Sequence, residues 1–90
     1  MTYKTNDLNL SGYLLASGCP ITGHSRVAGK TQFEFNQTDK VTRLVETYYS
    51  LHAEINPQAF SAAVRTLKNI LYQDTDSNDR QFSYQQRKAW

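Results

Sequence analysis

The sequence pattern that most constrains the fold follows Asn56-Pro57. Apolar residues then recur at the three- and four-residue spacing of one helix face, and they are Phe60, Ala63, Val64, Leu67, Ile70 and Leu71. Asn56 is suited to cap this helix, and Pro57 suits its first position, where a backbone N–H has no helical partner. Because a short helix with one apolar face is stable only when that face packs on another layer, the rest of the chain must supply that layer.

A second helix is predicted to begin after Asn36-Gln37, with Thr38 as its N-cap residue and Asp39 in its first turn. Its apolar stripe consists of Val41, Leu44, Val45, Tyr48 and Leu51. His52 follows at the helix end, where we expect its ring to donate to the last carbonyl groups.

An earlier helix is predicted to open at Thr5 or Asn6 and to stop at Gly18. It is apolar on two sides, with Leu10, Tyr13, Leu14 and Ser17 on one and Leu8, Gly12 and Leu15 on the other. A helix of this kind is usually buried between layers or shared with a partner. Glycine in a helix interior costs about 1 kcal/mol relative to alanine, so Gly12 points to a close approach of another backbone.

Residues 21–35 are predicted to form a β-hairpin. Phe33 and Phe35 alternate with polar residues, as in a strand with one wet face. Residues 27–30 form the predicted turn, with Gly29 at positive φ. In the first strand, Ile21, Gly23, Ser25 and Val27 are expected to share one face.

Residues 23–31 resemble the sequence pattern of a phosphate-binding loop, but they do not match it. The first glycine stands one place too early, and a strand follows instead of a helix.

These elements predict a small α+β domain with the order α-β-β-α-α and one shared core. Ninety residues suit a single domain. We expect residues 1–73 to form the compact domain, residues 74–79 a polar linker, and residues 80–90 a basic and aromatic tail. This packing leaves no preorganised pocket in which a substrate would react.

The sequence also excludes several classes of protein. The longest apolar run has four residues, 13–16, far short of the roughly 18–20 of a membrane span. The polar start does not resemble a secretory signal, and a single cysteine, Cys19, cannot form an internal disulfide. We therefore expect a cytoplasmic protein.

No catalytic or metal-binding pattern is present in the sequence. Cys19, His24 and His52 lack the short paired spacing of zinc ligands, and Cys19 is interpreted as a small packed residue. His24 and His52 have no partner that the sequence would orient for acid–base work, and the glutamates are scattered. We expect a protein that is not an enzyme, without cofactor, metal or small-molecule substrate.

Two groups of residues are candidates for binding. On the last helix, Ser61, Arg65, Lys68 and Tyr72 fall together beside the apolar stripe, where two cations and a phenol suit a phosphate backbone and a base. The same residues also fit an ordinary solvated helix face. In the tail, the candidates are Arg80, Tyr84, Arg87, Lys88 and Trp90. The tail pattern fits single-stranded nucleic acid, docking onto a protein including a second copy, or folding back with Phe82 and Trp90 in a groove.

The order of several short segments resembles a family of short bacterial and phage proteins of unknown function. Residues 4–18 read K-T-x-D-L-x-L-x-x-[YF]-L-L-A-x-G, and the later matching pieces are Phe33-Glu34-Phe35, Tyr48-Tyr49, Asn56-Pro57-Gln58-Ala59-Phe60 and Thr66-Leu67-Lys68. The resemblance covers about residues 4–72 and leaves the tail unmatched. It implies one fold and a bacterial or phage setting, and no catalytic residue.

Two functional hypotheses follow. The first is a small binding module in a nucleic-acid-associated setting, acting through the last helix and the tail. The net charge of +2 is low for that role. The alternative is a protein–protein adaptor, an inhibitor or a homo-oligomeric structural protein that uses the apolar first helix and the aromatic tail.

Overall fold

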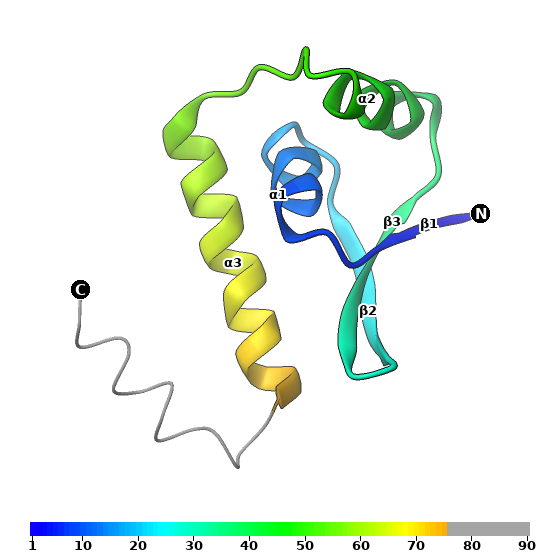
Figure 1. The fold of residues 1–90 in the computed structure, drawn as a ribbon, viewed down its shortest axis with the longest axis vertical. Helices are drawn as coiled ribbons and strands as arrows, with labels where there is room; N and C mark the ends of the chain where they lie inside the picture. The colour runs from blue at the N-terminus through cyan, green and yellow to red at the C-terminus, as the bar shows by residue number, and fades with distance from the viewer. Residues whose placement is uncertain (76–90) are drawn as a thin grey trace.

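The structure is a computed structural model that describes residues 1–75 (Figure 1). The elements follow in the order β1 (Thr2–Thr5), α1 (Leu8–Ala16), β2 (Ile21–Val27), β3 (Lys30–Asn36), α2 (Asp39–Tyr49) and α3 (Pro57–Thr75). The predicted α+β class is confirmed. The predicted order is wrong in one respect, because it lacks β1.

The helices cover one face of the sheet. Figure 1 shows α1 between α3 and the sheet, with α2 beside α1 at the end of the sheet where β3 leads into it. The core forms where these elements meet, and its buried members are Leu10, Tyr13, Leu14, Cys19, Phe33, Phe35, Val41 and Leu67. The predicted convergence of three helical stripes and the Phe33/Phe35 face on one core is therefore confirmed. Cys19 is buried, as its interpretation as a packed residue requires.

Strand β1 completes a three-stranded antiparallel sheet with the order β1-β3-β2. It pairs with β3 from Thr2↔Asn36 to Thr5↔Phe33. Four residues are too few to show a period of two, and three of the four are polar, so the sequence pattern gave no strand signal. Tertiary pairing with β3 determines the conformation of this segment.

The start of α1 also differs from the prediction. Asp7 is the N-cap residue, and its Oδ1 accepts a hydrogen bond from the backbone N–H of Leu10 at 3.0 Å. Thr5 still belongs to β1, and its Oγ1 accepts from the N–H of Asp7 at 3.1 Å. The helix therefore opens later than Thr5 or Asn6, because β1 holds the preceding residues extended.

The hairpin is confirmed, including its turn. Ala28 and Gly29 have φ values of 53° and 80°, the pair of left-handed residues that a two-residue type I′ turn requires. The predicted face of β2 is wrong at one end, because a bulge between Ile21 and Gly23 shifts the register. Ile21 lies opposite Phe35 and packs on the core, whereas Gly23 lies opposite Glu34 on the other face.

Two helices end with the same hydrogen-bond pattern but with different residues. After α1, Gly18 at φ 96° lets the N–H of Cys19 reach the carbonyl of Leu14 at 3.0 Å. After α2, Leu51 holds the equivalent position at φ 67°, and the N–H of His52 reaches the carbonyl of Thr47 at 3.0 Å. Both are Schellman motifs, which favour glycine at the left-handed residue.

The end of α2 corrects two predictions. Leu51 is 90% exposed, so it does not extend the apolar stripe of the helix. His52 satisfies the carbonyl through its backbone N–H and not through its ring, and its exposed Nδ1 lies 3.1 Å from the Ser50 Oγ. The reversal of the chain at Leu51 turns both side chains away from the core.

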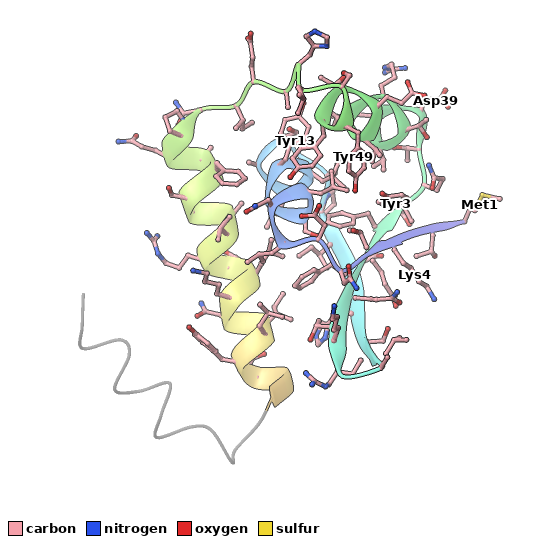
Figure 2. All side chains as sticks on the ribbon, viewed as in Figure 1. Met1, Tyr3, Lys4, Tyr13, Asp39 and Tyr49 are labelled. Carbon is pink, nitrogen blue, oxygen red and sulfur yellow. The ribbon has the colours of Figure 1, made fainter. Side chains whose placement is uncertain are left out.

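Four tyrosines gather where β1, α1 and α2 meet, and Figure 2 labels three of them: Tyr3, Tyr13 and Tyr49. The Tyr48 ring lies 5.9 Å from that of Tyr13 and 5.3 Å from that of Tyr49, measured between centroids. Burial raises the pKa of Tyr3 above its usual 10.0, with smaller contributions from Tyr49 and then Asp7. Burial also raises the pKa of Tyr48, with Asp7 and then Tyr49 adding to the effect.

Leu51→Gly is expected to stabilise the protein. The left-handed conformation costs a non-glycine residue about 1–2 kcal/mol, while glycine costs about 0.5–1 kcal/mol in chain entropy. Because the Leu51 side chain is 90% exposed, little packing is lost, and a net gain of about 0.5–1 kcal/mol should appear in urea unfolding. The matched control is Gly18→Leu, which should destabilise. A less stable Leu51→Gly variant would show that the leucine makes a contact that outweighs its backbone conformation.

The stability of the protein is expected to fall above about pH 10, the usual tyrosine pKa. Because the folded-state pKa values of Tyr3 and Tyr48 are raised, the unfolded chain releases these protons first, and the free energy of unfolding decreases as the pH rises. Urea midpoints at about pH 9 and about pH 11 test this linkage. A Tyr3→Phe/Tyr48→Phe variant should show a smaller decrease, and an unchanged decrease would contradict the assignment to these residues.

Candidate functional site

One surface candidate lies on α3, whose start is as predicted. Asn56 Oδ1 accepts hydrogen bonds from the N–H groups of Gln58 at 2.8 Å and Ala59 at 3.0 Å, and Pro57 is the first helical residue. The inward face of the helix buries Ala63 and Leu67. The helix extends through Thr75, two residues into the segment expected to be a linker.

The structure brings three of the predicted binding residues together. Ser61, Arg65 and Lys68 are exposed and line one open pocket of about 280 Å³. Tyr72 is 39% exposed and does not line this pocket. The five predicted tail residues, Arg80, Tyr84, Arg87, Lys88 and Trp90, lie outside the described residues.

The other residues of this pocket were not predicted as binding residues. We call it the α3 pocket, and its lining is Asn9, Phe60, Ser61, Val64, Arg65 and Lys68. Phe60 and Val64 were assigned to the apolar stripe, and both are half-buried, so each serves the packing and the pocket at once. Asn9 belongs to α1 and is exposed. No sequence pattern shows which residue of α1 lies beside α3.

The electrostatics of the α3 pocket favour an anion. Its lining has two cations and no carboxylate. Within residues 1–75, neither Arg65 nor Lys68 has an ion-pair partner. By contrast, α2 carries Lys40 and Arg43 at the same spacing, and Asp39 and Glu46 lie four and three residues from Arg43, whereas the acid of α3, Asp74, lies six residues from Lys68. The cations of α3 are therefore the less neutralised pair.

Close packing of α1 on α3 forms the base of this region. A Cβ atom on Gly12 would lie 2.9 Å from Val64 Cγ2 and 3.2 Å from Phe60 Cε1. We expected Gly12 to leave room for another backbone. The structure shows that it leaves room for two side chains of α3 instead. Because Phe60 and Val64 also line the α3 pocket, Gly12 fixes how far these side chains sink toward α1.

The remaining candidates from the sequence do not form a site together. The segment that imitates a phosphate loop is the β2–β3 hairpin. His24 is exposed on β2, and His52 follows α2. Residues 1–75 hold no group of three or more histidine, cysteine or acidic side chains placed to bind a metal.

A family model for a domain of unknown function, DUF5659, matches residues 1–73. The chain belongs to this family. No curated protein matches the chain, and no solved structure does. In this DUF5659 domain, no helix of the described part is both long and apolar enough to cross a membrane.

Gly12→Ala is expected to destabilise the DUF5659 domain. The added methyl group meets Val64 Cγ2, and overpacking of this kind costs about 1–3 kcal/mol, partly offset by about 1 kcal/mol of helix propensity. Urea unfolding should therefore show a net loss of about 1 kcal/mol.

A double-mutant cycle identifies the cause of this loss. Val64→Ala removes the Cγ2 atom that the new methyl group would meet. In that background, Gly12→Ala should cost clearly less than in the wild type, because the closest contact is gone and only Phe60 Cε1 at 3.2 Å opposes the gain in helix propensity. Equal losses in both backgrounds would contradict the proposed steric contact.

Proposed function

We propose that this protein is a non-catalytic binding module that acts in a nucleic-acid-associated setting. The observation that supports this proposal is the α3 pocket, an exposed hollow with two cations and no carboxylate in its lining. Phosphate groups supply most of the affinity in sequence-independent nucleic-acid binding, so an unneutralised pair of cations is the minimum that such a surface needs.

The two cations can divide the work of binding a phosphate backbone. Arg65 offers a planar guanidinium that can bind one phosphate through two hydrogen bonds, whereas Lys68 acts as a compact point charge. Residues three apart on a helix are neighbours, with Cβ atoms about 5–6 Å apart. The Ser61 hydroxyl, in the same pocket, adds a neutral donor.

The overall charge adds little to this interaction. Residues 1–73 contain seven basic and five acidic residues, a difference of +2, and residues 74–90 contain three of each. Long-range steering is therefore weak, and affinity must come from local contacts. The salt slope is the slope of log K for binding against log salt concentration. Two phosphate contacts on a single strand correspond to a salt slope of about −1.4, since each contributes about −0.7.

A protein partner is the second candidate, and a specific observation favours it. Tyr49 is 60% exposed and Leu51 is 90% exposed at the end of α2. The apolar sides of α1, in contrast, face the interior, because Leu10 and Leu14 are fully buried and Leu8 and Leu15 pack against the core. If the chain binds a protein or a second copy, the end of α2 is a better-placed surface than α1.

Charge removal on α3 tests the proposal. We expect Arg65→Gln/Lys68→Gln to make the salt slope of single-stranded oligonucleotide binding shallower by about 1.4, measured by fluorescence anisotropy between about 50 and 200 mM salt. Lys40→Gln/Arg43→Gln is the matched control, since it removes the same charges at the same spacing from α2. Equal effects of the two variants, or wild-type binding that does not change with salt, would contradict the proposal.

A further inference from the structure

We infer that the α3 pocket binds one unstacked base of a single-stranded nucleic acid, with the neighbouring phosphates on Arg65 and Lys68. This inference rests on the proposed function and names the form of nucleic acid that the site takes. It follows from three features of the α3 pocket: its concave shape, its apolar wall and the amide group at its edge.

The concave shape distinguishes this site from a simple basic surface. A phosphate backbone binds to a flat or convex row of cations, so phosphates alone require no hollow. The α3 pocket has a volume of about 280 Å³, near the lower limit of about 300–1,000 Å³ for small-ligand pockets. A space of this size suits one planar ring system, attached to a strand that continues outside.

The wall of the pocket suits the face of a base. Phe60 and Val64 supply apolar surface, and both are half-buried. The Cε1 edge of Phe60 is directed toward Gly12, since an added Cβ there would lie 3.2 Å away. Contact with α1 therefore holds the Phe60 ring in place. The rest of the ring lines the pocket, where a base can stack on it, and stacking of a base on an aromatic ring is favourable.

Asn9 supplies the group that can read the edge of a base. Its side-chain amide both donates and accepts hydrogen bonds, and adenine presents the matching acceptor and donor pair. Asn9 lines the pocket from α1, whereas Arg65 and Lys68 line it from α3. A base in the pocket would thus meet a specificity residue from one helix and the charges for its phosphates from the other.

The same geometry favours a single strand over a duplex. In a duplex, the bases are stacked and paired, and a base must be flipped out before it can enter a pocket. An unpaired strand presents its bases without this cost. The two cations and no carboxylate at the pocket are complementary to a polyanion, whereas they do not select a neutral peptide.

The experiment uses the full chain and three labelled single strands of about 12 nucleotides: oligo-dA, oligo-dT and an abasic strand with the same number of phosphates. We expect the abasic strand to bind about tenfold more weakly than oligo-dA, because stacking and hydrogen bonds of the base are lost. Asn9→Ala should abolish the preference for oligo-dA over oligo-dT and leave the salt slope unchanged. Asn69→Ala is the matched control, since this residue is exposed on α3 but does not line the pocket.

The outcomes separate the inference from the proposed function. Equal, salt-dependent binding of oligo-dA and the abasic strand would overturn the base pocket and leave phosphate binding on α3 intact. Tighter binding of duplex than of single strand would also overturn it. Absence of salt-dependent binding to every strand would overturn both proposals and favour a protein partner.

Discussion

The close packing of α1 on α3 is the contact on which the rest of the structure depends. Gly12 allows it, because Val64 and Phe60 occupy the space that a larger residue would need. With α3 covering one of its sides, α1 presents Leu10 and Leu14 to the core that it shares with the sheet and α2. Both apolar sides of α1 are therefore packed against other elements of this one small domain. Ser11, next to Gly12, is fully buried, and its Oγ has no hydrogen-bond partner among residues 1–75, so this position carries the cost of an unsatisfied hydroxyl.

The same contact produces the candidate site. The α3 pocket opens where the first turn of α1 meets α3, and half-buried side chains form its wall because they are also part of the packing between the two helices. A binding surface that shares residues with the helix–helix contact is rigid, which keeps the entropic cost of binding low. If the α3 pocket binds a ligand as proposed, substitutions of Phe60 or Val64 would change stability and binding together, whereas Asn9, Arg65 and Lys68 are exposed and can be changed with little effect on the fold.

The sequence predicts those features that depend on local interactions. The caps at Thr38 and Asn56, the hairpin turn and the inward faces of three helices each follow from a few neighbouring residues, and the structure confirms them. The errors arise where a distant segment decides the conformation. Strand β1 is defined by its pairing with β3, the bulge reverses the face of Ile21, and Leu51 leaves its stripe because the chain turns there. For the site, helical spacing placed Ser61, Arg65 and Lys68 together, but Asn9 depends on how two helices pack, which periodicity does not encode.

The position of β1 in the sheet has a consequence for how the chain assembles. This strand is synthesised before the other two strands, yet its hydrogen-bond partner is β3, which follows only after α1 and β2. The β2–β3 hairpin closes through a short loop and can form early. Strand β1 can pair only after β3 has been made, and this pairing closes the sheet over a long separation in sequence. During that delay, the free edge of β3 is open to any other extended segment, including β1 of a second chain. Exchange of this strand between two nascent copies is thus the misassembly to which the topology is most exposed.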